Sequence, residues 1–316
     1  MFPTLQHQSR FTWDFWYYFD LKEKQFHIFY LNADPKLVHD EQHHFHSQVG
    51  YATTKDFTII EWGSDNVLTS SPNRWDNSSI WTGDVIKIND GFLLFYTSRN
   101  LETDDGKTQN IGVAFADRIN ASKWEPIQDF RLRPDGNIYL SKGIKEDVTI
   151  HAWRDPFLFC YNNECYMLVT AKTSANPVGR NGVVALLHSK NGGFKDWEYL
   201  YPASNPGCYS EMEVSQILIN DNGNFELAFS TGPKYDNTPL TKGQGGLYTM
   251  VSENPLSFQK APVMLNAFQN GLYACRIIPE LGNAIVGFDL KTGGLRRCDI
   301  KNTYQPVNKY FSDWKI

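Results

Sequence analysis

Short apolar and aromatic runs, each followed by a polar turn, recur along the whole chain and predict β-strands. Five of these runs follow turn residues: QFHIFYLNA (25–33), GFLLFYTSR (91–99), CYMLVTAKT (165–173), FELAFSTGP (225–233) and NAIVGFDLK (283–291). Turn sequences suited to hairpins precede three of them: NDG (89–91), YNNE (161–164) and DNGN (221–224). No long stretch has the 3.6-residue period of an amphipathic helix. The pattern therefore predicts an all-β protein.

Each of these runs is the second strand of a longer repeating unit. Strands predicted to come first are TWDFWYYF (12–19), IWTGDVIKI (80–88), AWRDPFLFC (152–160), MEVSQILI (212–219) and ACRIIPE (274–280). Third segments are predicted at 49–62, 111–124, 183–197 and 246–258. The units repeat every 60–72 residues, which suits a four-stranded sheet with its loops.

Five such units nearly exhaust the 316 residues, so we predict one catalytic five-bladed β-propeller domain over residues 1–316. A β-sandwich is the competing fold. A closed ring needs a latch, and either residues 1–10 or the segment YFSDWKI (310–316) could complete a sheet begun elsewhere.

Charge and cysteine content narrow the function classes. The net charge of −5 and pI near 5.9 argue against nucleic acid or an anionic membrane as the main partner. The first residues lack the basic start and apolar core of a signal peptide, and no apolar run approaches 18 residues. Five scattered cysteines without a CxxC pair favour free thiols and a cytoplasmic location. No cofactor and no metal is predicted.

Three carboxylates lie near the starts of predicted first strands, in units one, three and four: Asp14, Asp155 and Glu213. The first strand of a propeller blade lines the central channel, so these side chains are expected to converge. Cleavage of a glycosidic bond needs one carboxylate to attack or activate water and one carboxylic acid to protonate the leaving oxygen. A third carboxylate can stabilise positive charge that develops on the sugar. The alternative for each residue is a structural cap or ion pair, for example Asp14 with Arg154 or Arg276.

The segment FTWDFWYYFD (11–20) supports a functional or paired role for Asp14. A lone carboxylate inside an aromatic strand costs free energy unless it is paired, hydrogen-bonded or has a function. A regular strand would place Asp14 and Trp16 on one face, and Trp13, Phe15 and Tyr17 on the other.

Four segments in this order resemble the signature segments of glycoside hydrolase families 68 and 32, the levansucrases, inulosucrases, invertases and β-fructosidases: WDFW (13–16), WTGD (81–84) with LFYT (94–97), WRDPF (153–157) and EMEVSQI (211–217). The resemblance implies a retaining mechanism on β-fructofuranosides, such as sucrose or fructo-oligosaccharides, through a covalent fructosyl-enzyme. Departures are Asp84, where the families usually have Ser, and the form EVSQ of the last segment.

The resemblance also implies roles for individual residues. Asp14 matches the nucleophile, Asp155 the transition-state stabiliser and Glu213 the general acid/base. Residues expected to bind substrate or hold these carboxylates are Trp13, Trp81, Thr82, Arg154 and Glu211. Among them, Trp81 would form an apolar wall, the Thr82 hydroxyl would bond the nucleophile, and Arg154 would donate to sugar hydroxyls or a neighbouring carboxylate.

Glu211 and Glu213 are two residues apart, so both could reach the channel. We expect Glu213 to be the acid because it matches the family position. It also lies one step deeper in the strand, where lower solvation raises a carboxyl pKa. If the mechanism is retaining, the carboxyl groups of Asp14 and Glu213 should lie about 5–5.5 Å apart.

Two other functions fit the same pattern. One is an inverting arabinofuranosidase or arabinanase on a similar propeller, and the other is a non-catalytic sugar-binding propeller. The segment HDEQHHFHS (39–47), with His39, His43, His44 and His46, is expected to be a polar loop or a rim that contacts substrate rather than a metal site. The long loops 172–182 and 231–246 are candidates for shaping the acceptor side.

Overall fold

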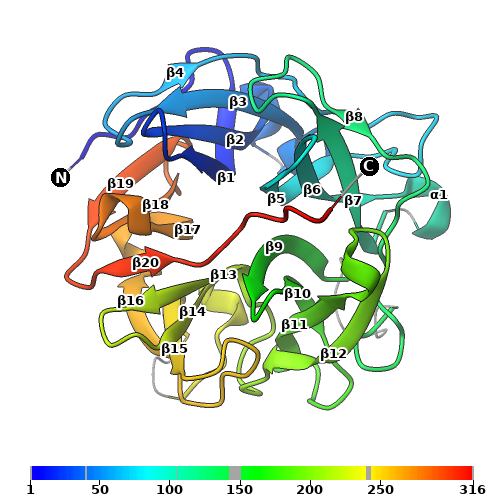
Figure 1. The fold of residues 1–316 in the computed structure, drawn as a ribbon. Helices are drawn as coiled ribbons and strands as arrows, with labels where there is room; N and C mark the ends of the chain where they lie inside the picture. The colour runs from blue at the N-terminus through cyan, green and yellow to red at the C-terminus, as the bar shows by residue number, and fades with distance from the viewer. Residues whose placement is uncertain (1, 40, 105, 142–150, 240–242, 315–316) are drawn as a thin grey trace.

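Five antiparallel sheets surround a central channel in the computed structural model, which describes residues 2–39, 41–104, 106–141, 151–239 and 243–314 (Figure 1). The predicted five-bladed β-propeller is confirmed. The innermost strands form a ring in which β5 contacts β1 and β9, and β13 contacts β9 and β17. In the described part of the chain, no helix is long and apolar enough to span a membrane.

The first three blades have four strands each. Blade one comprises β1 (Phe11–Asp20), β2 (Gln25–Ala33), β3 (Gln48–Thr54) and β4 (Glu61–Trp62). Blade two comprises β5 (Ile80–Ile88), β6 (Gly91–Arg99), β7 (Gln109–Ala116) and β8 (Glu125–Pro126). Blade three comprises β9 (Trp153–Tyr161), β10 (Glu164–Lys172), β11 (Gly182–Ser189) and β12 (Trp197–Ser204).

The last two blades differ from this plan. Blade four comprises β13 (Glu213–Asn220), β14 (Phe225–Thr231), β15 (Gly246–Ser252), β16 (Val263–Ala267) and the C-terminal β20 (Tyr304–Pro306). Blade five comprises β17 (Leu272–Ile278), β18 (Ala284–Asp289) and β19 (Leu295–Asp299). Helical elements are short: α1 (Leu101–Asp104), η1 (Pro35–Leu37), η2 (Gln42–Phe45), η3 (Lys190–Gly192), η4 (Pro233–Tyr235), η5 (Phe268–Asn270) and η6 (Pro279–Leu281).

The hydrophobic core is divided into five clusters, one between each pair of neighbouring blades. The cluster between blades one and two, for example, joins Trp16 and Phe29 to Leu94 and Tyr96. Each sheet is therefore covered on both faces. This explains why strands such as β2 read as continuous apolar runs rather than as alternating patterns.

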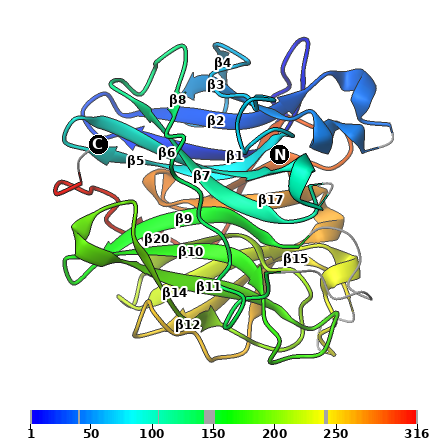
Figure 2. The same cartoon turned by 90° about the vertical axis from the view of Figure 1, so that its right-hand side faces the viewer.

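Both ends of the chain close the ring. Leu5 exchanges two backbone hydrogen bonds with Leu295 of β19, so the N-terminal segment adds a fourth strand position to blade five, as one of the two predicted latches. The other predicted latch, 310–316, has a different position. The C-terminal segment pairs with β13 and then crosses one end of the channel, bonding Asn308 to Cys160 and Phe311 to Lys87 (Figures 1 and 2). Residues 315–316 lie outside the described residues.

The predicted first strands agree with β1, β5, β9, β13 and β17 to within two residues at each end. The predicted third segments are too long, because each continues past the end of the third strand into the turn that follows it. Segment 49–62, for instance, contains both β3 and β4.

Candidate active site

Every innermost strand carries a β-bulge at the same level of the channel. The bulged residues are Trp13 and Asp14 opposite Leu31, Thr82 in β5, Asp155 and Pro156 opposite Val169, Val214 and Ser215 opposite Phe229, and Ala274 and Cys275 opposite Gly287. A bulge adds one residue to a strand and re-aims the side chains around it. The five bulges bring Asp14, Thr82 and Asp155 to one level of the channel, beside Glu213.

The bulge corrects the face assignment within residues 11–17. Trp13 and Trp16 share the cluster between blades one and two, whereas Phe15 packs in the cluster between blades one and five. The extra residue breaks the two-residue alternation, so Trp13 does not share a face with Phe15. It also explains how Asp14 occupies an aromatic strand and still faces the channel.

Backbone strain accompanies these bulges. Asp155, Val214 and Ala274 have φ angles of 58°, 54° and 47°, in the left-handed region that side chains other than glycine rarely adopt. Gly83 follows Thr82 where a Cβ atom would lie 2.1 Å from the carbonyl oxygen of Phe95. The glycine of the WTGD segment is therefore required by the close approach of two strands.

Asp14 is held by one directed hydrogen bond. The hydroxyl Oγ1 of Thr82 donates to its Oδ2 at 2.6 Å, the contact that the family resemblance implied. Burial raises the pKa of Asp14 to about 7, helped by the charges of Asp155 and Glu213 and opposed by the Thr82 hydrogen bond. The charges of Asp155 and Glu213 both act on Asp14, and Arg154 contacts both of these carboxylates, so the three predicted carboxylates converge.

Asp155 is buried beneath the site and connects three blades. Its Oδ2 accepts hydrogen bonds from the Val214 N–H and the Thr170 hydroxyl, both at 3.0 Å, and its own N–H donates to Thr97 Oγ1. Burial raises its pKa, and the charge of Arg154 opposes that shift. These bonds fix one oxygen of Asp155.

Arg154 joins the two glutamates. Its Nη2 donates to Glu211 Oε2 at 2.7 Å and to Glu213 Oε1 at 2.8 Å, and Lys172 Nζ lies 3.1 Å from Glu211 Oε1. Arg154 was expected to donate to sugar hydroxyls or to a neighbouring carboxylate, and in the structure it donates to two carboxylates. Although burial alone lowers it, the two glutamates raise the pKa of Arg154 well above its usual value.

The relative solvation of the two glutamates is the reverse of the expectation. The Glu211 side chain is 7% exposed and the Glu213 side chain 17%. Glu211 precedes β13 and is enclosed by Arg154 and Lys172, whereas Glu213 begins the strand at the channel. The expectation that the Glu213 side chain is less solvated than the Glu211 side chain is therefore wrong. Its assignment as the acid now depends on its place beside Asp14.

Tyr273 is a site residue that the sequence reasoning missed. Its hydroxyl donates to Glu213 Oε2. Burial, followed by the charge of Glu213, raises the pKa of Tyr273 well above its usual value, so the phenol stays protonated and remains a donor. The repeat of the blades could have identified Tyr273 from the sequence. Tyr273 occupies in β17 the bulge position that Glu213 occupies in β13, but the predicted strand began one residue later.

Trp81, His44 and Arg99 form one wall of the site. Trp81 is half-buried, its Nε1 donates to the carbonyl oxygen of His44 at 2.8 Å, and the Arg99 guanidinium lies 5.4 Å from its ring centroid. Burial lowers the pKa of His44 to about 3, helped by nearby His43 and Arg99, so the ring is neutral near pH 7. Trp13 is only 3% exposed and packs edge-on against His43 and His44.

The histidine segment thus packs against two predicted site tryptophans, and residue 40 of that segment lies outside the described residues. In the described part of the chain, the group of side chains with metal-ligand spacing is Asp20, Glu23 and His27, at the turn between β1 and β2. There, Asp20 Oδ1 already accepts two turn N–H groups.

The bond from Thr82 gives a testable pH effect. Removing the hydroxyl in Thr82→Val takes away a donor that favours ionised Asp14, so the pKa of Asp14 should rise above about 7. A hydrogen bond to a charged group contributes about 1.5–3 kcal/mol, which predicts a shift of roughly one pKa unit or more. We expect kcat/KM to fall about tenfold at pH 6 and much less at pH 9. Thr82→Ser should retain the wild-type pH profile. An equal fractional loss at all pH values would contradict this role.

Comparisons with known proteins define the class. The family model "Glycosyl hydrolases family 32 N-terminal domain" matches residues 17–218, well over half of the chain. The protein therefore belongs to glycosyl hydrolase family 32, and the prediction of a glycoside hydrolase of the fructoside-acting families is confirmed. The matched span contains Asp155 and Glu213 and begins three residues after Asp14. No curated protein matches the chain.

Solved structures share the fold at low identity. An inulosucrase from Halalkalicoccus jeotgali bound to kestose has a TM-score of 0.72 and 19% identity, over 98% of this chain and 92% of that one. A β-fructofuranosidase catalytic domain from Microbacterium saccharophilum K-1 has a TM-score of 0.68 and 18% identity, over 96% of this chain and 79% of that one. A levansucrase from B. megaterium, solved as a point mutant, has a TM-score of 0.69 and 14% identity, over 95% of this chain and 86% of that one.

Proposed function

We propose that the protein transfers the fructosyl group of β-fructofuranosides, such as sucrose or fructo-oligosaccharides, to water or to a second sugar with retention of configuration. The observation that carries the proposal is the convergence of the three carboxylates in a family 32 chain: Arg154 contacts both Asp155 and Glu213, and their charges raise the pKa of Asp14. The inulosucrase of the same fold binds kestose, which supports a fructoside as the substrate.

In the first step, an oxygen of ionised Asp14 attacks the anomeric carbon of the fructosyl unit. The Thr82 bond occupies Oδ2, which leaves Oδ1 for the attack. The bond from the anomeric carbon to the leaving oxygen breaks, and Glu213 protonates that oxygen. Asp155 stabilises the positive charge that develops on the sugar, since its carboxylate is anchored at one oxygen.

In the second step, Glu213 takes a proton from water or an acceptor hydroxyl, which attacks the anomeric carbon and releases Asp14. Arg154 and Tyr273 both donate to Glu213. They therefore stabilise the carboxylate that forms when the acid has given up its proton. We further propose that Trp81 contacts the sugar, and that buried Trp13 supports the rim of His43 and His44.

The test of this function is product analysis with sucrose and with kestose. The proposal predicts free glucose from sucrose, together with free fructose if water is the acceptor, or oligosaccharides if sucrose is. The loops 172–182 and 231–246 contact each other through Asn237 Nδ2 and the Gly179 carbonyl oxygen, and they are the proposed acceptor side; residues 240–242 lie outside the described residues. Release of arabinose from arabinosides without activity on fructosides would contradict the proposal, as would binding of fructosides without turnover.

Glu211 should act through Arg154 rather than on the substrate. In Glu211→Gln, Arg154 keeps Glu213 as a partner but loses one ion pair, and Lys172 loses the carboxylate that lies 3.1 Å from its Nζ. Removing one partner of a buried ion pair typically costs about 3–5 kcal/mol. We expect a lower melting temperature and a raised KM, with the same relative rates on good and poor leaving groups as the wild type. A variant with unchanged stability and a leaving-group-dependent kcat would show that Glu211, not Glu213, is the acid.

We also propose a cytoplasmic location, because an odd number of scattered cysteines suits a reducing compartment. Fractionation of the native cells tests it, and recovery of the protein outside the cytoplasm would contradict it.

A further inference from the structure

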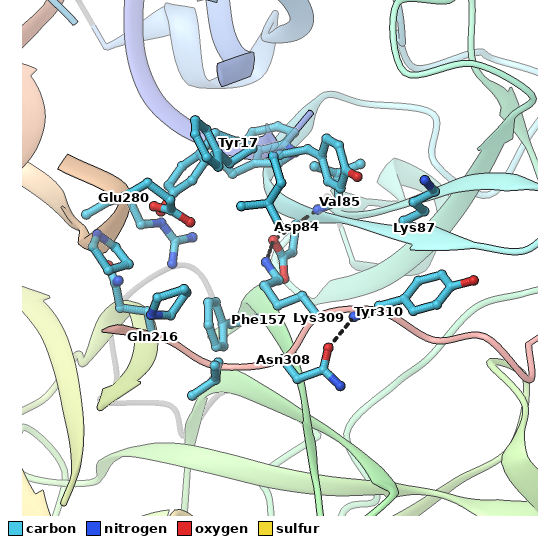
Figure 3. A pocket seen from close by; sticks show the side chains of 18 of the residues that line it. Tyr17, Asp84, Val85, Lys87, Phe157, Gln216, Glu280, Asn308, Lys309 and Tyr310 are labelled. Atoms are coloured by element: carbon cyan, nitrogen blue, oxygen red, sulfur yellow. Dashed lines mark hydrogen bonds and ion pairs between the residues drawn. The ribbon is translucent and has the colours of Figure 1, made fainter. Parts of the chain in front are cut away.

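A cavity of about 750 Å³ lies in the channel beyond the bulges, and its lining residues follow Asp14, Asp155 and Glu213 along the innermost strands. Figure 3 shows side chains that line it. Its walls are residues that follow the bulges in the innermost strands, together with the turn at Pro279 and Glu280. The C-terminal segment from Pro306 to Tyr310 forms another wall. The cavity is therefore distinct from the proposed active site, although both belong to the same channel.

Arg276 is a buried charged group of this cavity whose donors are only partly satisfied. It is only 3% exposed, and its Nη1 donates to the carbonyl oxygen of Ser215 at 3.1 Å. Its Nε and Nη2 have no hydrogen-bond partner among the described residues. Buried donors of a charged group are costly when they are left unsatisfied.

These two nitrogens have a particular geometry. In any arginine, the Nε–H and the Nη2–H point in the same direction along one edge of the planar guanidinium. That edge matches the two oxygens of a carboxylate or phosphate and binds them with two parallel hydrogen bonds. The unpartnered part of Arg276 is therefore the part suited to an oxyanion.

The acidic groups of the cavity are already engaged elsewhere. Asp84 Oδ1 pairs with Lys309 Nζ at 2.5 Å, and its Oδ2 accepts the Leu158 N–H at 2.8 Å (Figure 3). Glu280 accepts a hydrogen bond from the Tyr17 hydroxyl, and burial raises its pKa, which favours the neutral acid. No carboxylate of the described residues lies within ion-pair distance of Arg276, although the charges of Asp84, Asp155 and Asp14 oppose the lowering of its pKa by burial.

The Asp84–Lys309 pair also explains a departure noted in the sequence. Asp84 replaces the usual Ser of the WTGD segment, and its partner Lys309 comes from the C-terminal segment. The pair fastens that segment across the channel end. It thereby holds the segment that forms one wall of the cavity.

Most of the remaining lining is apolar or aromatic, including Trp16, Tyr18, Phe157, Ile217 and Val307. We propose that this cavity binds a small organic anion, whose carboxylate or phosphate pairs with Arg276 and whose apolar body packs against Phe157 and the C-terminal segment. The volume lies in the range of ligand pockets, which combine apolar walls with a few polar groups.

Calorimetric titration of the full chain with three probes tests the charge requirement. Phenylacetate and benzyl phosphate carry the two oxyanions on the same aromatic body, and phenylacetamide is the neutral analogue of the first. We expect at least one anion to bind ten times or more tightly than the amide, and the stronger of the two identifies the head group. If neither anion binds more tightly than the amide, or if no probe binds, the proposal is overturned.

Two pairs of variants locate the binding. Val307→Phe adds bulk to the wall against which the apolar body would pack and should weaken binding at least tenfold while leaving Arg276 in place. Val263→Phe, at an exposed position on blade four, should bind as the wild type does. Arg276→Lys should weaken anion binding at least tenfold, since lysine keeps the charge but lacks the paired donors. Wild-type affinity in folded Val307→Phe would place the ligand elsewhere and refute the site.

Discussion

Asp14→Asn should reduce kcat/KM on sucrose by about 10⁴-fold or more, because the amide oxygen cannot form the covalent intermediate. The site should otherwise persist, since the Thr82 hydroxyl can donate to the amide oxygen as it does to the carboxylate. Asp117→Asn, at an exposed aspartate far from the channel, is the matched control and should retain full activity. A loss of less than tenfold in Asp14→Asn would remove Asp14 from the mechanism.

The same variant should be more stable than the wild type at pH 8. The pKa of Asp14 is about 7 in the folded protein against 3.8 in the reference state, so the folded protein holds the proton more tightly. Stability associated with this group is therefore present below pH 4 and is lost as the pH rises towards 7. At about 1.4 kcal/mol per unit, the cost of ionising Asp14 is on the order of a few kcal/mol. Asparagine avoids this cost, so the gain in melting temperature should be large at pH 8 and small at pH 4.

Glu213→Gln should give the second large effect, and its size should depend on the leaving group. We expect kcat/KM on sucrose to fall by about 10³-fold, because glutamine cannot protonate the leaving oxygen. An activated aryl fructoside, whose leaving group needs no proton, should form the covalent intermediate at close to the normal rate. The intermediate should then persist, because the variant also lacks the base that activates water.

The measurement is a comparison of the first turnover and the steady state with both substrates. A burst of aryl alcohol followed by slow turnover is the expected result. An equal loss on sucrose and on the aryl fructoside would show that Glu213 contributes binding rather than acid catalysis. Glu211→Gln serves as the companion variant, since it removes a carboxylate that contacts the same arginine nitrogen.

The blade pattern was readable because each sheet is short, apolar on both faces and closed by Asn, Asp or Gly turns. Strands β2, β5 and β6 begin and end at the predicted residues. The convergence of Asp14, Asp155 and Glu213 followed from that pattern, since equivalent strands of a ring meet at one channel.

The bulges could not be read from the sequence. A one-residue insertion in a strand leaves no compositional mark when the residues are Trp13 and Asp14 or Val214 and Ser215, and only the pairing register reveals it. The error over Glu211 has a related cause. Its burial comes from Arg154 and Lys172, which are distant in sequence and close only after the blades assemble.

The C-terminal segment shows a third limit. The sequence suggested that it could act as a latch strand. Its path across the channel end is held by backbone hydrogen bonds to Cys160 and Lys87, by the Lys309–Asp84 ion pair and by burial of Trp314 between blades two and three. None of these features has a local sequence signal.

The central claim is that Asp14 becomes covalently linked to the fructosyl group. The most direct test is peptide mapping by mass spectrometry of Glu213→Gln, quenched with acid during turnover of an activated aryl fructoside. The account predicts a mass increase of one fructosyl residue confined to the peptide that contains Asp14. A fructosyl group on another carboxylate, or turnover with no adduct and with inverted product, would contradict it.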